Sequence, residues 1–281
     1  MPTKLTPENY YSHDTDWEYM SFSLFKDFQR CEAAALAKLK GDWTPELDAK
    51  PLLVGNYVHS YFESPEAHEK FVKDHKSKIM STRGKTKGQL KADYKFADVM
   101  IKALDDSELF NYVYKPGRKE VIVTGKLFGY DWKGKIDSLV LDQNYFCDLK
   151  TVDDLHKKHW QEDSRSWDNF IEDRGYYMQM AIYQELIKQT FGKDCNPYMF
   201  AVSKQAIPDK LAIDFTGESE AVRMQAALEE IEANQERYWN IMMGEIKPKP
   251  CGRCEYCRSH KVLDEFVHAT DIEVYQWRFG R

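Results

Sequence analysis

The hydrophobic pattern changes period twice along this chain, and this change restricts its fold more than any other feature. Residues 120–151 contain four short runs rich in β-branched and aromatic residues, separated by glycines and by Asp142-Gln-Asn144. Such runs predict the strands of a meander at 120–124, 127–132, 135–141 and 145–151. Longer segments with helical spacing precede and follow them. The pattern therefore predicts an α/β fold with a central sheet flanked by helices.

Helices are expected on both sides of this sheet. We predict a helix from Ser23 to Gly41 with Cys31 on its buried stripe, one over 53–62, and further helix through to about Leu109. The later elements are expected to be helices at 174–190 and 218–243 and strands at 198–202 and 211–215.

The chain has no internal repeat and no low-complexity linker, so residues 1–281 are expected to form one domain. Its parts are an N-terminal segment at 20–50, a core at 51–215, and a C-terminal helix with a cysteine cluster at 216–281.

Composition excludes two classes of protein. With 42% hydrophobic residues the chain can bury a large core, yet no apolar run approaches the roughly 18 residues of a membrane helix. The N-terminus lacks the apolar region of an export signal, so we expect a cytoplasmic protein without membrane contact. A net charge of −6 argues against coating of nucleic acid through bulk charge.

One segment departs from this acidic balance. Between Lys70 and Lys95 the chain has nine lysines and arginines against Asp74 and Asp93. Such a strip is a candidate for phosphate contacts, and it is equally typical of a solvated helix face or a loop. The candidate DNA-binding residues are Lys78, Arg83, Lys85 and Lys87.

A constellation of acidic residues and a lysine lies in the predicted sheet. Asp137 follows Gly134-Lys-Ile, and Asp148-Leu-Lys150 lies on the next predicted strand. Residues two apart on a strand share a face, so Asp137, Asp148 and Lys150 are expected to converge. Two carboxylates there would bind Mg²⁺ or Mn²⁺, and the lysine would assist the attacking water. The pattern indicates phosphodiester hydrolysis, although Asp-x-Lys by itself is common.

This arrangement resembles the restriction-endonuclease-like PD-(D/E)xK nuclease core, and the resemblance implies that the central sheet flanked by helices is mixed. The motifs around it resemble the RecB-like branch of that family. Gly55-Asn-Tyr-Val-His59 matches the upstream histidine of the branch, and Gln179-Met-Ala-Ile-Tyr183 matches its Q-x-x-x-Y helix. Two positions depart from the pattern: Ile136 stands where proline is nominal, and the second acid is Asp148 rather than Glu.

The resemblance implies a ligand set for the divalent metal consisting of His59, Asp137, Asp148 and the Leu149 carbonyl. It also implies that Gln179 and Tyr183 position the DNA strand. Two further carboxylates, Glu63 and Glu120, are close in sequence to these motifs, and each could complete or support the metal site.

Disulfides are not expected among the six cysteines of a cytoplasmic chain, because that compartment keeps thiols reduced. Cys251, Cys254 and Cys257 form a C-x₂-C-x₂-C motif, and Cys31 is the expected distant fourth ligand. This spacing suits a [4Fe–4S] cluster, and a Cys₄ zinc site is the alternative. Iron–sulfur members of the RecB-like branch also use one upstream and three downstream cysteines, with a longer last spacing. Cys147 and Cys195 are expected to be buried apolar residues.

Within the branch the chain is most similar to phage and prophage RecE-like (exonuclease VIII-type) exonucleases. The resemblance implies a metal-dependent exonuclease acting on linear duplex DNA ends, in phage-type recombination or repair, with a single-strand annealing protein as partner. It also implies a homo-oligomer and, for a phage-encoded chain, a place in the host cytoplasm. The alternatives are a CRISPR-adaptation-like or single-strand-end nuclease, and a non-catalytic DNA-end binding module with a structural metal.

Overall fold

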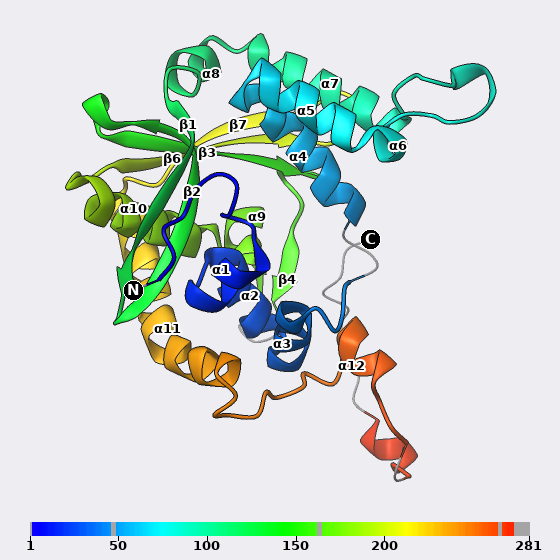
Figure 1. Ribbon diagram of the computed structural model, residues 1–281, viewed down its shortest axis with the longest axis vertical. Coiled ribbons are helices and arrows are strands. Elements are labelled where there is room, and N and C mark those ends of the chain that lie inside the picture. The colour runs from blue at the N-terminus through cyan, green and yellow to red at the C-terminus, as the bar shows by residue number, and fades with distance from the viewer. Residues whose placement is uncertain (1, 46–48, 162–164, 264–265, 273–281) are drawn as a thin grey trace.

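The computed structural model describes residues 2–45, 49–161, 165–263 and 266–272. Its centre is a five-stranded sheet with the order β1-β2-β3-β6-β7 (Figure 1). Strands β3 and β6 are parallel and the other neighbours are antiparallel, which confirms a mixed sheet. The strands are β1 (Arg118–Leu127), β2 (Tyr130–Val140), β3 (Tyr145–Val152), β6 (Asn196–Ser203) and β7 (Lys210–Asp214), and a separate hairpin consists of β4 (His159–Gln161) and β5 (Ser166–Asp168).

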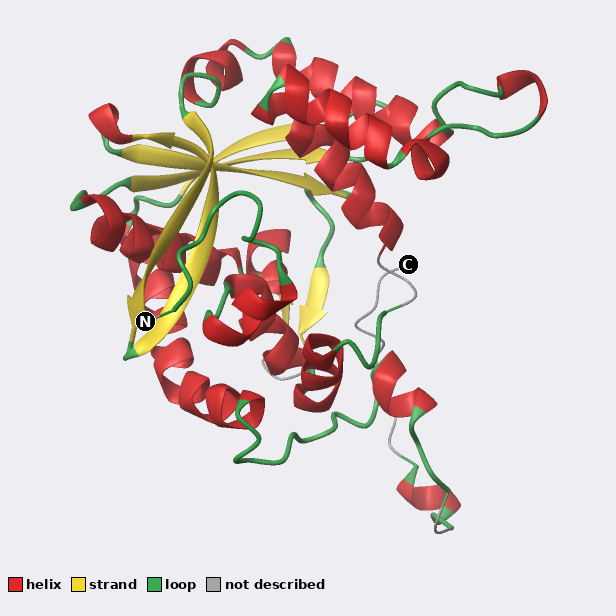
Figure 2. Cartoon of the chain, in the orientation of Figure 1, coloured by secondary structure: helices red, strands yellow, loops and turns green. Residues whose placement is uncertain are grey.

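Helices cover both faces of the sheet (Figure 2). One face packs against α4 (Ala49–Glu63), α5 (Pro65–Asp74), α7 (Ala92–Asp105) and α8 (Glu108–Val113). The other face packs against α2 (Phe22–Arg30), α3 (Glu32–Lys40), α10 (Tyr176–Phe191) and α11 (Glu218–Met242). The remaining helices are short: α1 (His13–Glu18), α6 (Lys76–Ile79), α9 (Phe170–Arg174) and α12 (Glu255–Ser259), with 3₁₀ turns at 84–86, 141–143 and 269–271.

Alternation along β3 separates the two cores. Tyr145, Cys147 and Leu149 pack with α4, α7 and α8, whereas Phe146 packs with α10 on the other face. Cys147 and Cys195 are fully buried, as expected for small apolar side chains. Asp148 and Lys150 therefore follow Phe146 on the α10 face.

The prediction of one continuous helix from Ser23 to Gly41 is wrong. Cys31 has an extended backbone, with φ −167° and ψ 109°, and it ends α2 and precedes α3. The break leaves the Ala33 N–H free to donate to the Lys249 carbonyl at 3.3 Å. Contact with the C-terminal segment thus competes with helical continuity at this residue.

Two other predicted elements are also different. The expected strand at 127–132 contains the turn of the β1–β2 hairpin, where Phe128 and Gly129 both have positive φ. The expected helix through the basic segment is divided into α5, α6 and α7 with a loop before α7. Gly84 and Gly88 adopt positive φ in this loop, which an uninterrupted helix cannot accommodate.

The C-terminal part begins with α11, as expected, and continues into the cysteine segment near α12. Residues 273–281 of the predicted C-terminal segment lie outside the described residues. Among the described residues, no helix combines the length and apolar character needed to cross a bilayer.

Candidate active site and cysteine centre

The candidate site lies where β2 and β3 stop pairing. Their ladder covers only the pairs from Ser138↔Cys147 to Val140↔Tyr145, although both strands continue beyond it. Just past the Ser138↔Cys147 pair, the Leu149 N–H donates to Asp137 Oδ2 at 2.7 Å. A carboxylate thus satisfies a strand N–H that has lost its ladder partner. This hydrogen bond fixes Asp137 between the diverging strands.

Helix α4 brings His59 to this point. His59 Nδ1 lies 3.5 Å from Asp137 Oδ2. A Cβ at Gly55, one turn earlier, would come within 3.3 Å of Thr151 Oγ1, so the glycine permits the close approach of α4 to β3. The Gly55-x₃-His59 spacing is therefore explained by packing and by the position of the imidazole.

Glu120 joins this group from β1. It stands opposite Asp137, between the ladder pairs Lys119↔Ser138 and Val121↔Ile136, and its φ is +54°. This left-handed conformation is uncommon for a residue with a side chain, and such conformations cluster at functional sites. One ligand atom from each of His59, Glu120 and Asp137 lies within 4.8 Å of the other two, and these three residues are called the close group below. From the sequence, Glu120 is a candidate without an assigned role. Its place opposite Asp137 in the antiparallel register, which the sequence does not reveal, brings it into the site.

Asp148 and Lys150 form the second half of the site, on one face of β3. Lys150 Nζ lies 2.7 Å from Asp148 Oδ2, and it lies over the Tyr176 ring at 5.1 Å from the centroid. Asp148 is almost completely buried. The expected proximity of this carboxylate and this ammonium is therefore present in the fold.

Helix α10 holds Asp148 from the opposite side. Gln179 Nε2 donates to Asp148 Oδ1 at 3.1 Å and to the Tyr183 hydroxyl at 2.9 Å. A Cβ at Gly134 would come within 3.0 Å of the Tyr183 ring, so this glycine makes room for the tyrosine. The Gln-x₃-Tyr pair therefore contacts the candidate site through Asp148.

Burial dominates the electrostatics of the site. Burial and repulsion by Glu120 raise the pKa of Asp137 to about 7, and burial raises the pKa of Asp148 to about 6 although Lys150 opposes this. Burial also lowers the pKa of His59, which favours the neutral imidazole that binds metals. For Lys150, burial is outweighed by Asp148, so its pKa is raised and it stays a cation.

Three carboxylates and a neutral imidazole therefore meet in a desolvated place with two neighbouring ammonium groups, Lys150 beside Asp148 and Lys135 beside Glu120. The raised pKa values of Asp137 and Asp148 indicate that the nearby positive charge does not offset their burial. Oxygen donors with one imidazole suit Mg²⁺ or Mn²⁺. The donor set of His59, Glu120 and Asp137, with Asp148 beside it, fits such a cation. Glu63 is exposed one turn after His59 and does not belong to the close group.

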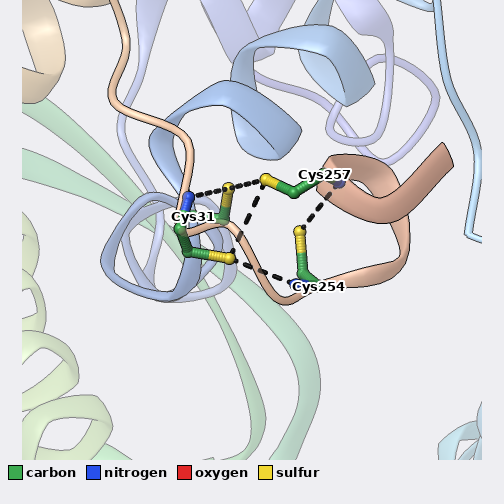
Figure 3. Close-up of side chains that lie close together, drawn as sticks. Cys31, Cys254 and Cys257 are labelled. Atoms are coloured by element: carbon green, nitrogen blue, oxygen red, sulfur yellow. Dashed lines mark hydrogen bonds between the residues drawn. The ribbon is translucent and has the colours of Figure 1, made fainter. Parts of the chain in front are cut away.

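The four predicted cysteines come together: Cys31, between α2 and α3, lies close to Cys251, Cys254 and Cys257 of the C-terminal segment. Figure 3 labels Cys31, Cys254 and Cys257 of this group. The Sγ atom of Cys257 lies 3.6 Å from that of Cys31 and 3.9 Å from that of Cys251. Backbone N–H groups of Cys251, Cys254 and Cys257 point at cysteine sulfurs at 3.3 to 3.5 Å. Such N–H groups stabilise thiolates, as expected for metal ligands.

The basic residues Lys78, Arg83, Lys85 and Lys87 are exposed, on α6 and on the loop before α7. The loop is ordered by an antiparallel bridge between Met80 and Leu90. It projects beyond α5 and α7, away from the sheet (Figure 1).

The chain is similar to a protein family and to a solved structure. The family described as "PDDEXK-like domain of unknown function (DUF3799)" matches residues 21–260. A crystal structure of a "putative exonuclease" from Eubacterium rectale superposes with a TM-score of 0.85 and 35% sequence identity, covering 96% of this chain and 98% of that one. No curated protein matches.

Proposed function

Since the chain belongs to the PDDEXK-like family, whose fold is that of a nuclease, we propose that it is a divalent-metal-dependent exonuclease that hydrolyses DNA from the ends of linear duplexes. One observation carries the proposal: the buried carboxylate of Asp148 and the largely buried carboxylate of Asp137 converge with Lys150 beside His59. The printed name of the similar Eubacterium rectale structure supports the exonuclease part.

The residues proposed to hold Mg²⁺ or Mn²⁺ are Asp137, Asp148, His59 and the Leu149 carbonyl, to which the close group adds Glu120. When bound, such a cation lowers the pKa of a water molecule and stabilises negative charge on a phosphate. The Leu149 N–H and the surrounding apolar residues hold the Asp137 carboxylate in place before substrate arrives. Preorganisation of this kind is what a hydrolytic site requires.

Lys150 is proposed as the catalytic cation. Its ammonium stays protonated beside Asp148, so it can orient an attacking water and stabilise the charge that develops on the phosphate oxygens. Gln179 positions the reacting groups by holding the other oxygen of Asp148, and it aligns the Tyr183 hydroxyl. A neutral His59 completes the donor set without adding positive charge.

Contacts outside the site extend the proposal to the substrate. Lys78, Arg83, Lys85 and Lys87 are proposed to contact phosphates of the duplex, because they are exposed on α6 and on the ordered, projecting loop that follows it. The role in phage-type recombination, the annealing-protein partner, the oligomer and the cytoplasmic location remain proposals from the family resemblance.

We also propose that Cys31, Cys251, Cys254 and Cys257 hold a structural metal centre. A tetrahedral zinc site with Zn–S bonds of about 2.3 Å separates its sulfurs by about 3.8 Å, which is close to the 3.6 and 3.9 Å found here. A [4Fe–4S] cluster inserts a cubane between its thiolates and requires wider separations. The sulfur positions therefore favour Zn²⁺, with the iron–sulfur cluster that the spacing predicts as the alternative.

The test of the nuclease is an assay with Mg²⁺ on end-labelled linear duplex, single-stranded and closed circular DNA. We expect degradation of the linear duplex alone. Lys150→Ala should abolish cleavage while DNA binding stays measurable, and Lys102→Ala, which removes an exposed surface lysine, is the matched control. Unchanged cleavage by Lys150→Ala would refute the site. Binding of ends without cleavage in Mg²⁺ or Mn²⁺ would favour the non-catalytic binding module.

The cysteine centre is tested on the same preparation. Anaerobic purification followed by metal analysis and a visible spectrum should give one zinc per chain and a colourless protein. A brown protein with about four irons per chain would replace zinc by the iron–sulfur cluster.

A further inference from the structure

Residues 10–16, which precede α2, are held against β2 by the buried Lys133. Lys133 is 2% exposed, and its ammonium contacts the Tyr10 carbonyl at 2.8 Å, Thr15 Oγ1 at 2.9 Å and Asp16 Oδ1 at 2.7 Å. These contacts use all three donors of the ammonium, as a buried cation requires. Residues 10–16 are therefore fixed on the sheet, across β2 in Figure 1.

This anchor places Tyr11 next to the candidate site. Lys135, two residues after Lys133 on β2, forms an ion pair with Glu120, and its Nζ lies 4.4 Å from the centroid of the Tyr11 ring. The Tyr10 ring packs edge-on against Tyr11, with centroids 4.8 Å apart. The contacts run from Tyr11 through Lys135 to Glu120, a member of the close carboxylate group.

Tyr11 is 74% exposed although its position is fixed. Its ring contacts the Lys135 ammonium and the Tyr10 ring, and the rest of its surface is open to solvent. Single exposed aromatic residues are common, and exposure by itself indicates nothing. Here exposure is combined with a dedicated anchor, a cation against the ring and a link through Lys135 to the group that includes Asp137 and His59.

An aromatic ring held in this way is suited to one ligand class, the nucleobase. Every base has a π face, and aromatic side chains bind bases by stacking with little regard to sequence. Bases inside a duplex have both faces covered by their neighbours. A base at a strand end, or one already unpaired, offers a free face.

On the premise of the nuclease function above, we propose that Tyr11 forms a base-stacking subsite for the terminal or unpaired nucleobase of the strand being cut. Lys135 supports the ring from behind and holds Glu120. The subsite explains a preference for ends without base-specific hydrogen bonds. Its substrate requirement is a base with one free face beside the phosphate in the site.

The experiment uses a linear duplex with 2-aminopurine as its terminal base, bound by the full chain in Ca²⁺ in place of Mg²⁺. Stacking quenches this fluorophore. We expect quenching with the wild type, Tyr11→Phe and Tyr11→Trp, and none with Tyr11→Ala or Tyr11→Leu, whose Kd should rise by about 5- to 100-fold. The retained signal of Tyr11→Phe would show that the ring acts, and not its hydroxyl.

The matched control is Tyr112→Ala. Tyr112 is 77% exposed, but it lies on α8, away from the N-terminal segment (Figure 1). This variant should quench and bind like the wild type. Thermal unfolding of each variant checks that the fold is kept.

Two failures can be told apart. If the wild type cuts linear DNA in Mg²⁺ while Tyr11→Ala and Tyr11→Leu quench and bind normally, the stacking subsite is refuted and the nuclease stands. If the wild type neither binds nor cuts DNA, the nuclease proposal fails, and the subsite fails with it.

Discussion

Replacing Asp137 by Asn should make the metal-free protein more stable, although the carboxylate is proposed to be essential for cleavage. Burial and Glu120 raise the pKa of Asp137 in the folded protein to about 7, from an ordinary value of 3.8. The folded protein thus holds a proton that the unfolded chain releases. Between about pH 4 and pH 7 the free energy of unfolding consequently falls as the pH rises, and it stays low above pH 7.

The two pKa values set the size of the effect. At pH 8 both states are ionised, and their difference corresponds to up to about 4 kcal/mol of stability lost through this carboxylate. At pH 5 mainly the unfolded state is ionised, and the loss is about 2 kcal/mol. Asn carries no charge and keeps an oxygen for the Leu149 N–H, so Asp137→Asn should recover these amounts.

The measurement is urea unfolding at pH 5 and pH 8, followed by tryptophan fluorescence, in buffer passed over a chelating resin. Adding Mn²⁺ at pH 8 should stabilise the wild type and leave Asp137→Asn almost unaffected. Asp106→Asn, which alters an exposed pair with Lys102, should change stability by less than about 1 kcal/mol at either pH. A stability gain that does not grow between pH 5 and pH 8, or a loss at pH 8, would refute the reasoning.

Three further outcomes are expected. The apparent Kd for Mn²⁺, measured by calorimetry, should weaken up to about tenfold as the pH falls from 7 to 6, because protons on Asp137 and Asp148 compete with the cation; a constant Kd would contradict this. Gln179→Met removes the hydrogen bond to Asp148 and should lower kcat by about 10- to 100-fold with DNA affinity kept, whereas unchanged kcat would exclude a positioning role. Cys257→Ser should lose the bound metal and about 3 kcal/mol or more of unfolding free energy, while Cys195→Ala should keep full metal content.

Much of the fold follows from local pattern. The central sheet between helices was predicted from the change of hydrophobic period, and α4, α10 and α11 lie close to their predicted ranges. Local patterns predict such elements because side-chain spacing determines which face of a helix or strand is apolar. The turn at Phe128 and Gly129 was missed, since the run 127–132 is equally apolar on both sides of it.

The break at Cys31 shows where local reasoning fails. The sequence from Ser23 to Gly41 has continuous helical spacing, and no proline interrupts it. The competing interaction comes from residues about 220 positions later, where Lys249 and Cys251 contact the Cys31 region. Such a contact has no signal in a local window.

By itself, the sequence determined the types of donor and their order: carboxylates, an imidazole and a lysine in the core, and four thiols near the chain ends. Those residue types fix which chemistry is available, because ligand preference and charge belong to the side chains. Only the tertiary structure decided which donors meet. It brought Glu120 opposite Asp137 and placed Gln179 against Asp148, because strand register and the packing of α10 on the sheet set distances that no local spacing encodes.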